Sequence, residues 1–215
     1  MIHEQAHDVK QSGKPGYHKN NVQGKYIQIH NSKVTISIFG KISNMFQAKF
    51  PRESICLTTE QVLPNDTNPL NTLFGGRLMQ WMDITGGIAS HRHCGRVCVT
   101  ASVNNVSFDQ PVKLGDVVTL EGKVSRAFNT SIEVFVDVWV ENPTGGKRKK
   151  CNQGIFTFVA VDQLGTPVPI PPVTPETEEE KLRFESALRR KQLALILAGR
   201  MKAEDASELK ALFGK

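Results

Sequence analysis

The 215-residue chain has no uninterrupted apolar run of the roughly eighteen residues that a membrane-spanning helix needs. Its first residues, MIHEQAHDVKQSGK, also lack the apolar segment of a secretory signal. Cysteine is scarce, with four residues and no CxxC pair, which argues against a disulfide framework. We therefore expect a cytoplasmic protein with free thiols and no membrane span.

An excess of positive charge is missing from the central part of the chain. The whole sequence carries a net charge of +6 and has a pI near 9.2. Residues 1–53 hold +5 of this charge, residues 54–174 are neutral, and residues 175–215 hold +1. A nucleic-acid-binding domain would need its basic residues on the folded part. The distribution argues against nucleic acid as a partner, unless the N-terminal residues alone bind it.

Composition divides the chain into three parts. Residues 1–50 are polar, with scattered Lys, Asn and Gly, and we expect a poorly ordered N-terminal extension. Residues 51–172 carry the hydrophobic periodicity of a folded domain. The proline-rich segment PVPIPPVTP (167–175) ends this domain, and residues 173–215 form a charged helical tail. Its helix opens with Glu and closes with Arg and Lys, as the helix dipole favours.

The middle part predicts one strand, one long helix and then four strands. The expected strands are 55–63, 97–108, 116–127, 131–141 and 154–162, and turn-like connections favour antiparallel neighbours. A helix over about residues 73–91 is apolar nearly all round, so we expect it to be buried. These elements predict an α+β fold of the hotdog type. An antiparallel sheet wraps around one long central helix, and a C-terminal helix is added.

Two glycines and an aspartate are unusual on such a helix. Gly75 and Gly76 open it, where backbone N–H groups lack intrahelical partners and the dipole is positive. Without side chains, these glycines let a carbonyl group come close to the backbone. Asp83 lies within the helix, where a carboxylate is costly unless it is paired or used. The alternatives are glycines that only permit tight packing, and an Asp83 paired with Arg77 or with a threonine.

Two segments, LPNDTNPLNTLFGGRLMQWMDITGGIASHRHC and VTASVNNVSFDQPVKLGDVV, together resemble the hotdog-fold acyl-CoA thioesterases. The most similar group is the cytosolic, brain-type and bacterial acyl-CoA hydrolases, and the resemblance covers about residues 55–175. It implies hydrolysis of a fatty acyl-CoA to a free fatty acid and CoA. It implies no cofactor, since CoA is part of substrate and product. It also implies active sites between paired hotdog units, in a homodimer or a trimer of dimers.

The resemblance assigns catalytic roles around the helix start. Gly75 and Gly76 are expected to stabilise the oxyanion, and Asp83 to act as general base or nucleophile. Gly76 and Asp83 are about 10 Å apart along one helix, so the aspartate of one unit should face the helix start of another. Relatives often carry Asn or Asp three positions before the glycine pair. Thr72 stands there, next to Asn71, and can offer a hydroxyl group but no base.

Polar residues elsewhere are candidates for binding the substrate. Asn129, Thr130 and Ser131 occupy a turn that touches CoA in relatives, although a plain polar turn is an equal alternative. Lys149, in the run KRKK, suits the phosphates of CoA, but such runs are more often solvated hairpin tips. Two further candidates for lining the acyl or pantetheine channel are Asn104 and Ser107.

Three alternatives to a metal-independent hydrolase can be compared with the sequence. A metal site could use His91, His93, Cys94 and Cys98, but no second ligand pair exists, so no metal is predicted. A dehydratase acting on acyl thioesters needs a histidine near the helix start, and none occurs between residues 31 and 90. A non-catalytic acyl-CoA sensor stays open, although Asp83 and the glycine pair count against it.

Overall fold

The computed structural model describes residues 47–108 and 110–212, all within one compact unit, Ile38–Lys215. Most of the predicted N-terminal extension, residues 1–46, therefore lies outside the described residues. Lys49 already belongs to the folded part, because its backbone bonds to Pro172 and Thr174 at 2.9 Å each. The C-terminal linker is held to the domain by this short parallel bridge.

Five strands form one antiparallel sheet in the order β1-β3-β4-β5-β2. The elements in chain order are η1 (Pro51–Ser54), β1 (Cys56–Gln61), η2 (Pro64–Asp66), α2 (Gly75–Cys94), β2 (Val97–Phe108), β3 (Val117–Ala127), β4 (Ser131–Glu141), β5 (Lys149–Val161), α3 (Glu178–Leu197), η3 (Ala203–Asp205) and α4 (Ser207–Lys210). This arrangement confirms the predicted α+β hotdog fold, and β2 and β4 have the predicted bounds.

The strand β5 begins five residues earlier than predicted. Lys149 and Lys150 continue the ladder with β4, opposite Val140 and Trp139. Lys150 also lies 2.6 Å from the Asp137 carboxylate. The end of the KRKK run is therefore part of the sheet rather than a hairpin tip.

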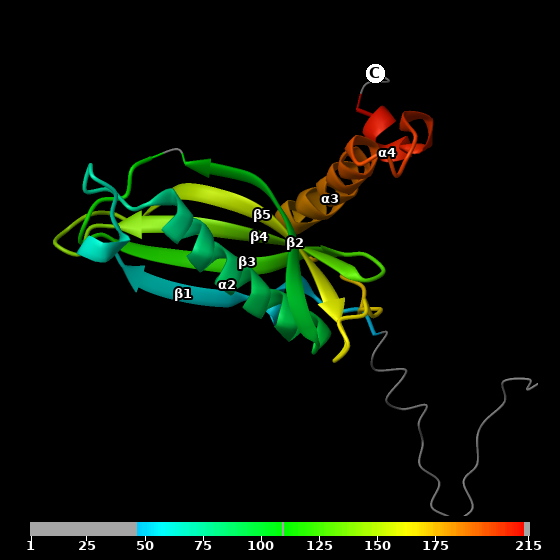
Figure 1. Ribbon diagram of the computed structural model, residues 1–215, viewed down its shortest axis with the longest axis horizontal. Coiled ribbons are helices and arrows are strands. Elements are labelled where there is room, and N and C mark those ends of the chain that lie inside the picture. Colours follow the sequence, from blue (N-terminus) through cyan, green and yellow to red (C-terminus); the bar gives the residue numbers. More distant parts are fainter. Residues whose placement is uncertain (1–46, 109, 213–215) are drawn as a thin grey trace, which may run out of the picture. The chain divides into compact units, whose positions relative to one another are not determined.

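The long helix α2 lies across one face of the curved sheet (Figure 1). Its buried side includes Leu78, Met82 and Ala89. Glycines permit the close approach, because a Cβ at Gly154 would lie 2.5 Å from Met82 Cε. A Cβ at Gly122 would lie 3.0 Å from the backbone oxygen of Thr85.

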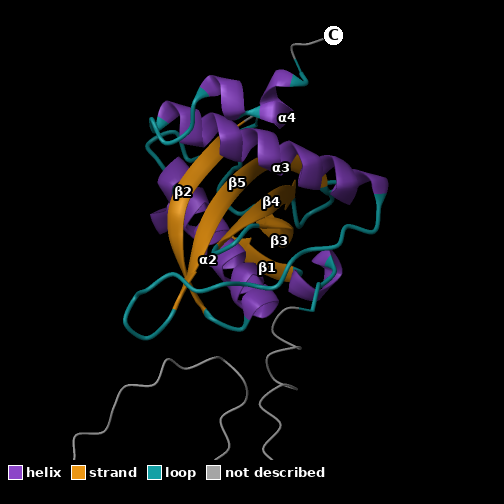
Figure 2. Cartoon of the chain, turned by 90° about the vertical axis from the view of Figure 1, so that its right-hand side faces the viewer, coloured by secondary structure: helices purple, strands orange, loops and turns teal. Residues whose placement is uncertain are grey.

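The C-terminal helix α3 crosses the opposite face of the same sheet (Figure 2). Arg190 contacts Glu133 on β4 at 2.7 and 2.9 Å, and Arg183 contacts Asp137 at 2.8 Å. Both carboxylates are buried beneath the helix. The charged tail thus closes the second face of its own sheet.

The prediction that α2 is buried all round is wrong for the single chain. The sheet covers only one side of the helix, and Met79, Ile84 and Ile88 are 40%, 51% and 38% exposed on the other. The neighbouring edge strand β2 also exposes Val97, Val99 and Val103. An apolar surface of this kind, beside an unpaired strand edge, is typical of a contact with another molecule.

Candidate active site

The helix α2 begins at Gly75, after Phe74 in an extended conformation. The amides of Gly75 and Gly76 make no hydrogen bond within residues 47–108 and 110–212. The buried carboxylate of Asp66 fixes the preceding loop, since it accepts bonds from the Leu63 amide and, at 2.8 Å, from Arg77 Nε. Arg77 is therefore committed to Asp66, which removes it as the partner of Asp83.

Gly76 does not serve close packing against the sheet. The three nearest atoms to a Cβ placed on Gly76 all belong to the ring of Phe74, at the start of the same helix. By contrast, Cβ atoms on Gly122 and Gly154 would meet atoms of α2 itself. Close packing between α2 and the sheet therefore uses glycines of both elements, because a Cβ on Gly86 of α2 would lie 2.9 Å from a ring atom on the sheet. Gly76, at the helix start, instead leaves its backbone donor accessible.

Asp83 is half-buried on the side of α2 that faces β2. Its Oδ1 accepts a hydrogen bond of 2.6 Å from Thr100 Oγ1 on that strand. The threonine fixes the direction of one carboxylate oxygen and leaves the other to act on a ligand. Seven residues, about 10 Å of helix, separate Asp83 from Gly76, so one chain does not bring them together.

The loop before α2 is organised by Asn68. Its Nδ2 donates to Thr72 Oγ1 at 2.9 Å, and its Oδ1 accepts from the Leu70 amide at 2.9 Å. Thr72, a predicted site residue, is held next to Gly75 by this contact. Asn71 is exposed and has φ 55°, a left-handed conformation that asparagine tolerates better than most residues. The backbone of the turn explains an asparagine at position 71.

Thr100 and Asn68 contact the predicted site residues Asp83 and Thr72, and the sequence analysis did not single them out. Asn68 begins an Asx turn in NPLN, where the side chain bonds the amide two residues on, and this is a recognisable signal. Thr100 lies in an alternating strand, but its contact with α2 depends on how helix and strand pack. The periodicity of the strand alone did not indicate that contact.

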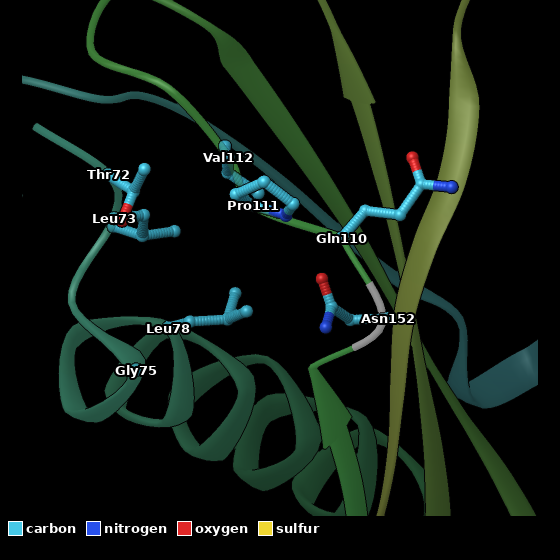
Figure 3. A pocket seen from close by; sticks show the side chains of 8 residues that line it. All are labelled: Thr72, Leu73, Gly75, Leu78, Gln110, Pro111, Val112 and Asn152. Atoms are coloured by element: carbon cyan, nitrogen blue, oxygen red, sulfur yellow. The ribbon is translucent and has the colours of Figure 1, made fainter. Parts of the chain in front are cut away.

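Two hollows flank the start of α2. The first has a volume of about 340 Å³ and is lined by Thr72, Leu73, Gly75, Leu78, Gln110, Pro111, Val112 and Asn152 (Figure 3). The second, of about 440 Å³, is lined by Asn65, Thr67, Phe74, Gly76, Arg77 and Gln80. Gly75 therefore borders the first hollow, and Gly76 borders the second.

The two predicted channel residues on β2 lie near different groups. Asn104 Nδ2 is 3.3 Å from Ser102 Oγ, on the strand itself. The backbone oxygen of Ser107 accepts a bond of 2.6 Å from Asn152 Nδ2. Ser107 thus contacts Asn152, which lines the first hollow.

The remaining predicted binding residues lie farther away. Asn129, Thr130 and Ser131 form the turn between β3 and β4, at the opposite end of these strands from the helix start. Lys191 of α3 donates to Ser131 Oγ at 3.2 Å. Lys149 is exposed at the first residue of β5. Within one chain, the structure does not join these four residues to Gly75 and Gly76.

The histidines and cysteines near the end of α2 have separate partners. His93 is buried, its Nε2 lies 2.8 Å from the Pro171 oxygen, and burial lowers its pKa. Cys94 and Cys98 face each other at 3.3 Å, and the hydrogen bond from Cys98 lowers the pKa of Cys94 to about 6. In the described part of the chain, no three His, Cys, Asp or Glu side chains are grouped to hold a metal ion.

None of the helices among the described residues is both long and apolar enough to cross a membrane.

The hotdog scaffold thus carries two chemical features on one helix, an open N-terminus that can bind an oxyanion and an aspartate held by a threonine. A family profile described as the thioesterase superfamily matches residues 70–147. The chain is 44% identical over 144 residues to the uncharacterised acyl-CoA thioester hydrolase YkhA of Bacillus subtilis, covering 67% of this chain and 84% of that protein. The protein therefore belongs to the acyl-CoA thioester hydrolases of the thioesterase superfamily.

Longer relatives contain this domain as a part. The cytosolic acyl coenzyme A thioester hydrolase of Rattus norvegicus is 39% identical over 124 residues, which are 57% of this chain. The chain spans only 32% of that relative's length. The similarity to the rat protein is thus limited to one portion of it.

Solved structures of acyl-CoA hydrolases share the fold. A hexameric acyl-CoA thioesterase superposes with a TM-score of 0.69 at 38% identity, covering 71% of this chain and 98% of that one. The acyl-CoA hydrolase of Staphylococcus aureus, in complex with butyryl coenzyme A and coenzyme A, gives 0.65 at 35% identity, covering 76% and 99%. Further structures of the S. aureus enzyme carry alanine in place of an aspartate, a threonine or an asparagine.

Proposed function

We propose that the protein hydrolyses acyl-CoA to a free carboxylic acid and CoA, without a cofactor. The observation that carries the proposal is Asp83, held by Thr100 at 2.6 Å on a helix whose first amides are free to bind a carbonyl oxygen. The membership of the chain in the acyl-CoA thioester hydrolases supports the same activity.

The amides at the start of α2 supply the electrophilic half of the site. A thioester carbonyl oxygen placed there would accept hydrogen bonds from Gly75 or Gly76, at the positive end of the helix dipole. The hydrogen bonds from these amides become stronger as the oxygen becomes an oxyanion, so they stabilise the transition state more than the bound substrate.

Asp83 supplies the basic half. Its free carboxylate oxygen takes a proton from water, whose oxygen bonds to the thioester carbon. The C–S bond then breaks, and CoA leaves as a thiolate that takes up a proton. A carboxylate can instead attack the carbon directly and form an anhydride that water hydrolyses. Thr100 holds Asp83 in either case.

The two halves come from different copies of the chain. Gly76 and Asp83 are too far apart on one helix to serve one carbonyl. The exposed apolar side of α2 includes Met79, Ile84 and Ile88, on the side of the helix that also carries Asp83. A homodimer, or a trimer of dimers as the hexameric neighbour suggests, would cover this surface and complete the site.

The three S. aureus substitutions point to the same constellation. The asparagine, aspartate and threonine replaced there are separated by 15 and 17 residues along that chain. Asn68, Asp83 and Thr100 have the same two separations in this sequence. We therefore include Asn68 and Thr100 in the proposed site. A cytoplasmic location is also part of the proposal, supported by the cytosolic rat relative.

The test is release of free thiol from a series of acyl-CoAs, from acetyl to palmitoyl, by the wild type and by Asp83→Asn. The substitution keeps the shape of the side chain and removes its basicity, so we expect a loss of roughly 10²- to 10⁴-fold in kcat. Glu60→Gln, which neutralises an exposed carboxylate on β1, is the matched control and should keep full activity.

Each contrary result has a separate meaning. A wild type that releases no thiol from any chain length contradicts the proposed function and favours a sensor. Release that survives Asp83→Asn, with the oligomer intact, keeps the activity and removes Asp83 from the mechanism.

A further inference from the structure

The side chain of Asn152, near the start of β5, has a fixed orientation. It is 2% exposed, and its Nδ2 donates a bond of 2.6 Å to the backbone oxygen of Ser107. Exchanging the nitrogen and oxygen of the amide would set two oxygens against each other. The contact with β2 therefore leaves the amide oxygen as the free end of the side chain.

This oxygen has no hydrogen-bond partner in the described part of the protein. Figure 3 shows the amide turned into the first hollow, toward Leu78 and Pro111. Gly75, at the start of α2, borders the same space. The hollow thus lies between the helix start, where the Gly75 amide has no partner among the described residues, and a buried acceptor.

The rest of the lining is mainly apolar. Leu73, Leu78, Pro111 and Val112 supply most of its walls. An alkyl chain lying there would leave the Asn152 oxygen dehydrated and unpaired, which is unfavourable. A ligand that brings an N–H or O–H group to the same place would satisfy it. A site built to hydrogen-bond a ligand discriminates strongly against one without the group.

We propose that Asn152 is a substrate-binding residue whose amide oxygen accepts a hydrogen bond from an N–H or O–H group of the bound acyl-CoA, while the start of α2 binds the thioester carbonyl. The inference rests on the proposed function and adds a second, opposite anchor to the same site. Two parts of an acyl-CoA carry such a donor. The amides of the pantetheine arm occur in every acyl-CoA, and a hydroxyl on the acyl chain occurs in only some.

The experiment compares butyryl-CoA with 3-hydroxybutyryl-CoA as substrates of Asn152→Leu. Leucine has the same number of side-chain heavy atoms and the same branching, but it is bulkier and has no acceptor. If the donor is the pantetheine amide, kcat/KM falls about tenfold for both substrates. If the donor is the acyl hydroxyl, it falls about tenfold only for the hydroxylated substrate. Unchanged values for both substrates would overturn the inference.

Two further variants separate loss of the acceptor from other effects. Asn152→Ala removes the acceptor without placing a branched side chain in the hollow, so the same pattern is expected. Gln153→Leu changes the exposed neighbour on the same strand and should leave both values at the wild-type level. Thermal unfolding of each variant establishes that it is folded. A loss with Asn152→Leu that Asn152→Ala does not share would be steric and would contradict the proposal.

Binding is measured separately, so that turnover is not required. S-Butyl-CoA and S-(3-hydroxybutyl)-CoA are thioethers that cannot be hydrolysed, and calorimetry gives their Kd values. A Kd about tenfold weaker for Asn152→Leu supports the inference even if the wild type hydrolyses nothing, in which case only the proposed function fails. An equal Kd, or no binding of either thioether by the wild type, overturns it.

Discussion

The two faces of the sheet are closed in different ways. On the face under α3, Glu133 accepts from Ser125 and Arg190, and Asp137 lies between Arg183 and Lys150. On the face under α2, the helix turns its other side outward with exposed apolar residues and a half-buried Asp83. On the first face, the buried carboxylates are paired with side chains of the same chain. On the second, exposed apolar residues and Asp83 are available for contact with another molecule. Stability and activity should therefore depend on different faces.

The largest effect is expected from a charge on the outward side of α2. In Ile84→Glu, a carboxylate replaces a 51% exposed isoleucine, which would be desolvated without a partner in a contact between copies. The oligomer should dissociate, and thiol release should fall at least about 10²-fold because the site needs two chains. Light scattering after size exclusion gives the oligomeric state, and the thiol assay gives the rate.

Leu164→Glu is the matched control for this substitution. Leu164 is 91% exposed in the turn after β5, so the same change there should leave both mass and activity unchanged. If Ile84→Glu kept the oligomer and the full rate, the α2 side would not be the shared surface. Activity would then not depend on the face under α2.

An intermediate effect, on stability alone, is expected on the α3 face. Glu133→Ala removes the acceptor of Ser125 and leaves the guanidinium of Arg190 without its carboxylate in a mostly buried position. The free energy of unfolding should fall by about 2–3 kcal/mol. The kcat/KM of the surviving folded enzyme should not change, since no predicted catalytic residue lies on this face. Denaturant unfolding and the thiol assay measure the two quantities.

Glu178→Ala is the control for a salt bridge without burial. It removes the exposed pair with Lys181 at the start of α3, and exposed pairs contribute little. An unfolding midpoint that moves as far in this control as in Glu133→Ala would show that burial of the pair is irrelevant.

Local periodicity was sufficient to predict most of the fold. The alternation in β2 and β4 set their bounds, and one long apolar helix among strands predicted the hotdog arrangement. The same pattern could not say what covers each side of α2, because a helix face buried in its own core and one buried by a second chain have the same composition. For that reason the full burial of α2 was predicted wrongly.

Site residues could be predicted only where the local sequence itself is unusual. Gly75, Gly76 and Asp83 could be singled out, because their types conflict with an ordinary buried helix. The contacts of Thr100 and Asn152 join elements that are far apart in the sequence. The residue spacing within one segment therefore cannot predict their roles. Asn68 is the intermediate case, since its turn is local but its contact with Thr72 needs the folded loop.

The smallest effect concerns His93, a titratable group that the chain itself seals at the end of α2. Its ring is fully buried, with Nε2 on the Pro171 oxygen and with Nδ1 unpartnered among the described residues. Burial lowers its pKa, and the charge of Lys49 acts in the same direction.

Below about pH 6.5, the unfolded histidine takes up a proton that the folded one does not, so the free energy of unfolding falls as the pH falls. This contribution stops changing only below the folded pKa. Comparing denaturant unfolding at pH 7.5 and 5.5, we expect the wild type to lose more stability than His93→Gln, which has no titrating ring. The difference is at most about 1.4 kcal/mol, the limit set by an unfolded pKa near 6.5. His91→Gln, at an exposed position of the same helix end, is the control and should follow the wild type. Equal losses in the wild type and His93→Gln would mean that the buried ring does not control this pH dependence.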